Sequence, residues 1–204
     1  EGIDELARQK GCFLEVAEIT RQAMEEGLSF KESLEKRLNL LKPSLDDIKR
    51  YHEKVLVNQF SIDLIKLIQK IKIDRKHIYI ISGGFEQLIL PYTDFLNIPR
   101  ENIFCNSLIF DDCGNYKSFD TSRLTCESSG KIKVIELIKQ RNNNANIMMI
   151  GDGTTDLETQ PYVHTFIGYG GNVERKSIKD KVNQLENSYY YHSFSKLIES
   201  LTTL

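Results

Sequence analysis

The sequence lacks several features that mark particular classes of protein. Its four cysteines, Cys12, Cys105, Cys113 and Cys126, are scattered, with no CxxC pair and no histidines clustered at metal-ligand spacing. Neither a disulfide framework nor a zinc site is therefore predicted, and a reducing, cytoplasmic setting fits this cysteine usage best. No apolar run approaches the roughly 18 residues that a membrane span needs, so no membrane partner is expected.

The net charge is also small. The chain has 27 Lys and Arg and 29 Asp and Glu, which gives a formal charge of -2. No global field would draw in nucleic acid or an anionic membrane, so an anionic substrate must be captured by a local site. With 204 residues, 40% of them hydrophobic, the chain can build one core and a small second domain. The sequence does not begin with Met, so we expect a truncated or processed chain, and an upstream targeting peptide stays open.

The first part of the chain, residues 1–60, has the spacing of apolar residues that is typical of helices. Leu14, Ala17 and Met24 are predicted to share the buried face of a helix that Gly27 ends. Ser44, with Asp47 three residues later, predicts another helix start. A further apolar stripe precedes it, formed by Phe30, Leu34, Leu38 and Leu41. We therefore predict a small helical-bundle domain over residues 1–60.

Residues 61–204 alternate helical patterns with short runs that are apolar at consecutive positions, at 78–81, 146–150, 165–167 and 189–191. Such runs suit strands covered on both faces, as in a parallel sheet between helix layers. A hairpin is predicted as an insertion at about 107–119. The predicted fold class is α/β, an open Rossmann-like parallel sheet with a helical cap, in which ligands bind beyond the carboxyl ends of the strands.

Polar and glycine residues follow these runs. Ser82-Gly83-Gly84 places a hydroxyl and free backbone amides where a helix begins, which suits an anion, although taken alone it is more simply explained as a plain turn that needs glycine. Asp152 and Asp156 give two carboxylates near one strand end, which suits Mg²⁺. An Asx turn and a favourable helix-dipole contact are the structural alternative for this pair.

Two more segments fit the same pattern. Lys131 opens a helix, against the helix dipole, so it points either to solvent or toward a phosphate as counter-charge. Gly170-Gly171-Asn172 follows the run at 165–167 in the same way. Each turn is ambiguous alone, but several α/β units ending at one sheet edge would share one crevice.

Together these residues resemble a known family. The segments 81–85, 127–131 and 150–156 resemble, in that order, the second, third and fourth signature motifs of haloacid-dehalogenase phosphatases. The turn at 170–173 and the opening residues 1–7 narrow the resemblance to the phosphoserine phosphatase branch, over essentially the whole chain. The resemblance implies a Mg²⁺-dependent phosphatase that hydrolyses O-phosphoserine to serine and phosphate, the last step of serine biosynthesis, with a small-molecule substrate and no nucleic-acid or membrane partner. It leaves oligomeric state open, with a homodimer as one option.

The resemblance also implies roles for individual residues. Ser82 and Gly83 would hold phosphate oxygens, and Lys131 would neutralise the nucleophile and the phosphate. Asp152 would ligate Mg²⁺, and Asp156 would support the metal through its water shell. Two further residues would line this pocket, Thr155 and Asn172.

Four cap residues are assigned to the substrate's amino-acid part by the same resemblance. Glu1 matches the acid that meets the substrate ammonium, and Arg37 matches the base that pairs its carboxylate, a bidentate task suited to guanidinium. Met24 and Phe30 match apolar groups that close over the substrate. Without the family, Arg37 would be one of 27 basic residues, and Met24 an ordinary core residue.

The sequence departs from the family pattern in three places. Ser129 and Ile132 stand where glycine is usual around the motif lysine, and Pro91 falls inside an expected helix, which predicts a kink. The nucleophile motif, Asp-x-Asp-x-Thr after the first strand, would precede Glu1 and is not in this sequence. We therefore expect residues 1–204 alone to be inactive. A decayed homologue that only binds phosphate ligands, or a phosphatase for another small phosphomonoester, is the alternative.

Overall fold

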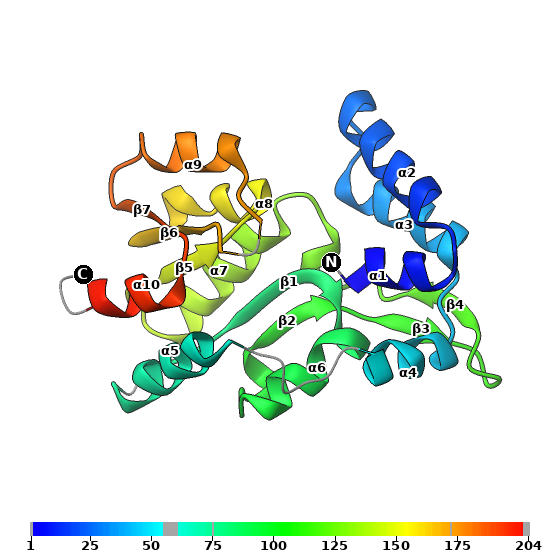
Figure 1. Ribbon diagram of the computed structural model, residues 1–204, viewed down its shortest axis with the longest axis horizontal. Helices are drawn as coiled ribbons and strands as arrows, with labels where there is room; N and C mark the ends of the chain where they lie inside the picture. Colours follow the sequence, from blue (N-terminus) through cyan, green and yellow to red (C-terminus); the bar gives the residue numbers. More distant parts are fainter. Residues whose placement is uncertain (1, 55–60, 75, 172, 202–204) are drawn as a thin grey trace. The chain divides into compact units, whose positions relative to one another are not determined.

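The computed structural model describes residues 2–54, 61–74, 76–171 and 173–201, with every side chain in these ranges except those of Met24 and Glu26. The chain forms two compact units, drawn in Figure 1. One comprises Glu1–Gln59 and Tyr79–Gly130, and the other Phe60–Ile78 and Lys131–Leu204. The predicted domain boundary at residues 60 and 61 stays a prediction.

Four helices open the first unit and form the predicted bundle. They are α1 (Gly2–Gln9), α2 (Phe13–Glu26), α3 (Phe30–Leu41) and α4 (Leu45–Lys54). Helix α1 contacts α2 and α4, and α2 contacts α3. Their shared core contains Leu6, Val16, Leu34, Leu38 and Ile48, all buried. Burial of these side chains, at about 25 cal/mol per Å² of apolar surface, is what holds short helices in place.

The helix ends follow the sequence signals, whereas one predicted helix face does not. Gly27 ends α2 in the left-handed conformation, with φ 67°. The predicted buried face of α2 was wrong, because Leu14 is 78% exposed. Ala17 is exposed as well, and the helix instead buries Val16 and Ala23. The contacts that α2 makes with α1 and α3 select this face, and the small Ala23 side chain lets neighbouring elements approach closely.

The first unit also holds two pairs of strands. β1 (Ile80–Phe85) pairs in parallel with β2 (Ile103–Asn106), and β3 (Leu108–Phe110) with β4 (Tyr116–Phe119) forms the predicted antiparallel hairpin. Helix α6 (Glu86–Phe95) follows β1 directly. Two short 3₁₀ helices complete this part, η1 (Arg100–Asn102) and η2 (Leu124–Cys126). Strand β2 was not predicted from the sequence.

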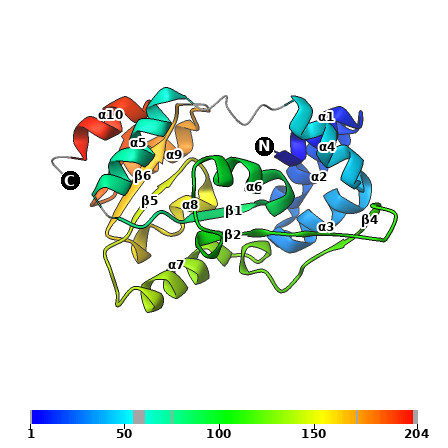
Figure 2. The same ribbon diagram turned by 90° about the horizontal axis from the view of Figure 1, so that it is seen from below.

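The second unit is an α/β layer structure. Strands β5 (Met148–Gly151), β6 (Thr165–Tyr169) and β7 (Ser188–Tyr191) form a parallel sheet in that order. Its helices are α5 (Ile62–Ile73), α7 (Gly130–Arg141), α8 (Thr154–Leu157), α9 (Lys176–Val182) and α10 (Phe194–Ser200), with η3 (Gln160–Tyr162). Helices α5 and α10 lie side by side in Figures 1 and 2. The predicted α/β class with parallel strands is therefore confirmed.

In the core of the second unit, the helices and the sheet meet at three fully buried side chains. Leu67 of α5, Ile167 of β6 and Leu197 of α10 pack against one another. Helix α9 contacts β6 and β7, and α8 contacts β5. The pairing of Gly151 with Gly168 places the carboxyl ends of β5 and β6 at one sheet edge. Within the described ranges, no helix combines the length and apolar character that crossing a membrane requires.

Candidate active site

The Ser82-Gly83-Gly84 segment, near the end of β1 in the first unit, is one candidate anion-binding turn. The Gly84 N–H donates to Ser82 Oγ at 3.0 Å, and the Gly83 carbonyl accepts from Asn106 Nδ2 at 2.9 Å. A Cβ on Gly83 would lie only 2.9 Å from Cζ of Phe30, so the ring of Phe30 covers this glycine. Because α6 begins right after the turn, its unpaired amide groups and dipole favour an anion there.

Arg37 lies in the same unit, on helix α3. Its side chain is buried, and Nε donates to the Ser33 carbonyl one turn earlier, at 3.2 Å. Arginine side chains are seldom buried, and the burial of this one is compatible with a role in binding. Glu1 and the side chain of Met24 lie outside the described residues, so their predicted roles stay predictions.

Lys131 and Asp156 form an ion pair in the second unit. Lys131 Nζ lies 2.5 Å from Asp156 Oδ1, and both side chains are largely buried. The second carboxylate oxygen of Asp156 accepts the Gly153 N–H at 3.1 Å, at the start of α8. Lys131 therefore does not point to solvent, and both oxygens of Asp156 are already engaged.

Gly151 makes this arrangement sterically demanding. A Cβ at Gly151 would lie 2.3 Å from both Cβ and Cγ of Asp156. Any larger residue at position 151 would have to displace that carboxylate. The glycine that precedes Asp152 is thus required by the packing of Asp156 against the end of β5.

Asp152 is more accessible than Asp156. Its side chain is 55% exposed, and Oδ2 lies 3.6 Å from the guanidinium of Arg175. Asp152 lines a cavity of about 290 Å³ beside the ends of β5 and β6. The other lining residues are Ile150, Gly151, Tyr169 and Val173. Thr155 is exposed at the start of α8, and Asn172 lies outside the described residues.

The donor chemistry at this strand end fits a hard cation. Asp152 and Asp156 offer carboxylate oxygens, which are the protein ligands that Mg²⁺ prefers. Among the described residues, however, no group of three or more His, Cys, Asp or Glu side chains is arranged to hold a metal ion. Asp152 would therefore bind a cation together with water, substrate oxygens or ligands from elsewhere.

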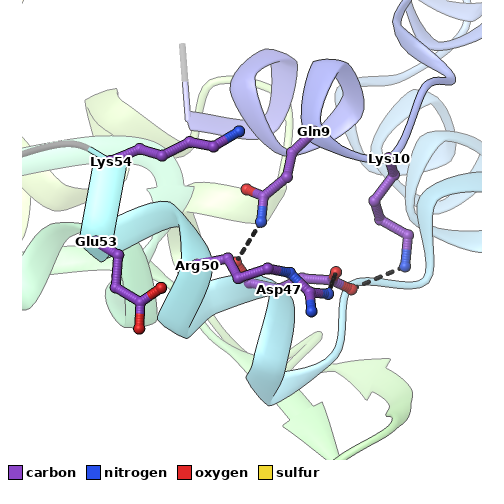
Figure 3. Close-up of a pocket in the computed structure, with 6 residues that line it drawn as sticks. All are labelled: Gln9, Lys10, Asp47, Arg50, Glu53 and Lys54. Atoms are coloured by element: carbon purple, nitrogen blue, oxygen red, sulfur yellow. Dashed lines mark hydrogen bonds and ion pairs between the residues drawn. The ribbon is translucent and has the colours of Figure 1, made fainter.

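A larger cavity, of about 590 Å³, lies between α1 and α4 of the first unit (Figure 3). It is lined by Gln9, Lys10, Asp47, Arg50, Glu53 and Lys54. Asp47 already pairs with Lys10 at 2.8 Å and with Arg50 at 2.6 Å. Because Lys10 and Arg50 are already engaged by the Asp47 carboxylate, the cavity is a weaker candidate than the smaller one beside Asp152, despite its size.

The structure adds residues that the sequence did not point to. Arg175 contacts Asp152, and Tyr169 and Val173 line the cavity beside it. Tyr169 and Val173 flank the glycine turn already singled out at 170–172, so the sequence of that turn could have indicated both residues. Arg175, one of many basic residues, carries no such signal.

Comparison with known proteins identifies the family, although no family model matches the chain. The phosphoserine phosphatase of Drosophila melanogaster is 37% identical over 199 residues, covering 97% of this chain and 72% of that protein. The Homo sapiens phosphoserine phosphatase is 38% identical over 204 residues, covering 98% of this chain and 87% of that one. The chain belongs to the phosphoserine phosphatase family.

Solved structures agree with this assignment. A phosphoserine phosphohydrolase-like protein from Francisella tularensis superimposes with a TM-score of 0.78 at 29% identity, covering 98% of this chain and 92% of that one. The predicted haloacid-dehalogenase type of fold is thereby confirmed. Ser82, Lys131, Asp152 and Asp156 all lie near the ends of strands or helices. Proteins of this fold class bind ligands at such positions.

Proposed function

We propose that this protein hydrolyses O-phosphoserine to serine and phosphate in a Mg²⁺-dependent reaction, as the last step of serine biosynthesis. The observation that carries the proposal is the 2.5 Å ion pair between Lys131 and Asp156. It joins the third and fourth family motifs, which are 25 residues apart, beside the end of β5. A buried lysine held by a carboxylate is a fixed positive charge, which is what stabilises a phosphoryl group during transfer.

The proposed roles follow from the chemistry of each group. Ser82 donates its hydroxyl to a phosphate oxygen and Gly83 offers its backbone amide, while Lys131 neutralises charge. Asp152 holds Mg²⁺, which when bound would neutralise the phosphate and orient it. Asp156 fixes Lys131 and supports the metal through water, because both of its carboxylate oxygens already accept hydrogen bonds.

The nucleophile is proposed to lie upstream of Glu1. The family mechanism needs an aspartate that attacks phosphorus and a second carboxylate that first protonates the leaving alkoxide and then activates water. Residues 1–204 contain no Asp-x-Asp-x-Thr sequence.

Substrate selection is proposed to rest on the cap. Arg37 would pair with the substrate carboxylate and Glu1 with its ammonium, and Met24, Phe30, Thr155 and Asn172 would line the pocket. The cover of Gly83 by the Phe30 ring supports the assignment of Phe30. We place the reaction in the cytoplasm on the cysteine usage, and a homodimer is compatible with this scheme.

The test is a phosphatase assay on the protein carrying the segment that its gene encodes ahead of Glu1. Phosphate release from O-phosphoserine should depend on Mg²⁺ and exceed release from phosphate esters without an amino acid. Comparable rates for all small esters would favour the broader phosphomonoesterase alternative. Absence of hydrolysis together with retained phosphate binding would favour a non-catalytic homologue.

A further inference from the structure

Asn106 lies beside the candidate anion-binding turn, Ser82-Gly83-Gly84, and belongs to none of the motifs noted above. It is the last residue of β2, directly after the apolar residues 103–105, and it is fully buried. Its Nδ2 donates to the Gly83 carbonyl at 2.9 Å, and its Oδ1 accepts from Thr125 Oγ1 at 2.8 Å. A peptide carbonyl accepts only, so the amide of Asn106 is fixed in this orientation.

The peptide that links Gly83 to Gly84 is held from both sides. Its carbonyl accepts from Asn106, and its N–H donates to Ser82 Oγ at 3.0 Å. Because a peptide group is planar, fixing both ends sets the position of the whole unit. Ser82 Oγ acts here as acceptor, which leaves its own O–H to be donated to an anion. A continuous chain therefore runs from the Thr125 hydroxyl through Asn106 and this peptide to Ser82.

The strand pairing explains why this turn needs a support. Ile81 pairs with Phe104 and Phe85 with Asn106, so β1 advances four residues while β2 advances two. Ser82, Gly83 and Gly84 therefore lie in an irregular stretch where ladder bonds are interrupted. Side chains must fix the backbone there, since buried backbone groups need partners. Thr125 comes from η2, which contacts both β1 and β2.

We propose that Asn106 and Thr125 are positioning residues for the anion-binding turn, and that they act through the Gly83–Gly84 peptide on the Ser82 hydroxyl. The proposal rests on the proposed function for the identity of the anion, a phosphate group. In this proposal, two buried residues outside the phosphate-binding motif determine the geometry of that motif. Both residues are buried and neither belongs to the proposed phosphate-binding groups, so removing the Thr125 hydroxyl should change phosphate affinity without removing a proposed phosphate contact.

The test compares three variants of the protein extended by the segment encoded ahead of Glu1. Thr125→Val removes the hydroxyl at nearly constant volume, Thr125→Ser retains it, and Thr93→Val is the matched control. Thr93 is also a buried threonine of the first unit, and its Oγ1 donates to the Leu90 carbonyl at 3.0 Å within α6. Each variant is measured for the dissociation constant of inorganic phosphate, for KM and kcat with phosphoserine, and for melting temperature.

Thr125→Val should raise the dissociation constant of phosphate about threefold to tenfold. This factor corresponds to the net free energy of one hydrogen bond. Thr125→Ser should restore the original dissociation constant. Thr93→Val should leave the dissociation constant of phosphate unchanged, even if it lowers the melting temperature as much as Thr125→Val does. In a Ser82→Ala background the effect of Thr125→Val should largely disappear, because the chain of contacts would no longer end in a hydroxyl.

Equal phosphate affinity in Thr125→Val and Thr93→Val would overturn the proposal, as would full additivity with Ser82→Ala. An unmodified protein that binds no phosphate would overturn it as well. If the unmodified protein binds phosphate but does not hydrolyse phosphoserine, the proposed function fails, while the phosphate measurements on the variants still decide the inference.

Discussion

Arg37 is the residue on which substrate selectivity is proposed to depend. In the protein carrying its upstream segment, Arg37→Ala should raise KM for phosphoserine about tenfold or more, since a charged hydrogen bond contributes roughly 1.5 to 3 kcal/mol. KM for phosphoethanolamine, which has an ammonium but no carboxylate, should change little. Steady-state kinetics with both substrates measures this difference.

The control for this substitution is Arg21→Ala, which removes an arginine of the same unit from the exposed side of α2. It should leave both KM values unchanged. Because Arg37 also bonds the Ser33 carbonyl, the melting temperature must be recorded for each variant. Equal damage to both substrates would contradict the carboxylate assignment and leave Arg37 a structural residue.

Asp152 and Asp156 should differ in their effect on magnesium. Asp152→Asn should raise the Mg²⁺ concentration for half-maximal activity at least about tenfold, because a proposed direct ligand loses its charge. Asp156→Asn should lower kcat with less effect on that concentration, because Asp156 holds Lys131 and the Gly153 N–H. Magnesium titrations of activity measure both, with the exposed Asp180→Asn as control. A magnesium dependence unchanged in Asp152→Asn would refute the metal role.

The sequence singled out the candidate residues, whose roles stay predictions, but it did not predict the contacts between them. Position and residue type identified Lys131 and Asp152, whereas the pairing of Lys131 with Asp156 depends on how α7 and α8 are placed. Ser129, noted as a departure from glycine, adopts the left-handed conformation with φ 58°, so the backbone kept the geometry that glycine favours. Gly130 could not change at all, since a Cβ there would lie 2.0 Å from the Leu124 carbonyl oxygen.

At the scale of elements, helix ends were predicted better than helix faces and strands. Gly27 and Ser44 mark their helix ends by local chemistry, which the sequence contains. The buried face of α2 depends on its partners, so Leu14 was wrongly assigned to the core. Strand β2 was missed, although its apolar run, Ile103-Phe104-Cys105, is as long as the runs at 165–167 and 189–191. Its recognition would have drawn attention to Asn106 by the same strand-end rule that identified Ser82.

Helix α6 contains a proline, Pro91, which is unfavourable inside a helix. It lies inside α6 and has no N–H for the Gln87 carbonyl four residues earlier. His52 Nε2 of α4 lies 2.8 Å from that carbonyl and donates to it, since a carbonyl can only accept. The Gln87 side chain in turn pairs with both backbone groups of Leu108. The lost helical bond is thus replaced from a neighbouring helix, and the bend predicted at Pro91 stays a prediction.

Asp47 couples the stability of the helical bundle to pH. Burial alone would raise the pKa of Asp47, but hydrogen bonds from Lys10, Ser44 and Arg50 together hold that pKa well below its usual range. A carboxylate with a depressed pKa in the folded state stabilises the fold above its unfolded pKa, about 4. That contribution is lost as the pH falls below about 4 toward the folded pKa.

Asp47→Asn should therefore lower the free energy of unfolding at pH 7 by on the order of 1 to 3 kcal/mol, the contribution of charged hydrogen bonds to a buried group. The gap to the unmodified protein should narrow as the pH falls from about 4 to about 2. Urea unfolding across this pH series measures it, and the neighbouring exposed Asp46→Asn should show no gap at any pH. A gap of constant size would mean that Asp47 contributes by packing rather than by charge.

At the scale of the whole molecule, two features decide whether residues 1–204 can catalyse on their own. The proposed anion-binding groups Ser82, Gly83 and Lys131 are present, whereas the Asp-x-Asp-x-Thr nucleophile motif is not. Covalent catalysis divides hydrolysis into two easier steps, and without the attacking carboxylate only positioning and charge stabilisation remain. Cys105 offers no substitute, since burial raises the pKa of its thiol to about 11 and keeps it protonated at neutral pH.

The polypeptide of residues 1–204 should accordingly release phosphate from phosphoserine at close to the background rate. It should also bind Mg²⁺ poorly, because the carboxylates of the nucleophile motif would not be there to bind the metal with Asp152. Joining it to the upstream segment should restore Mg²⁺-dependent turnover. Both proteins are compared in one phosphate-release assay, with circular dichroism to establish that the shorter one folds. The extended protein with the first aspartate of its Asp-x-Asp-x-Thr motif changed to asparagine is the control, and should be as inactive as the short chain. Robust Mg²⁺-dependent turnover by residues 1–204 would show that another residue attacks phosphorus.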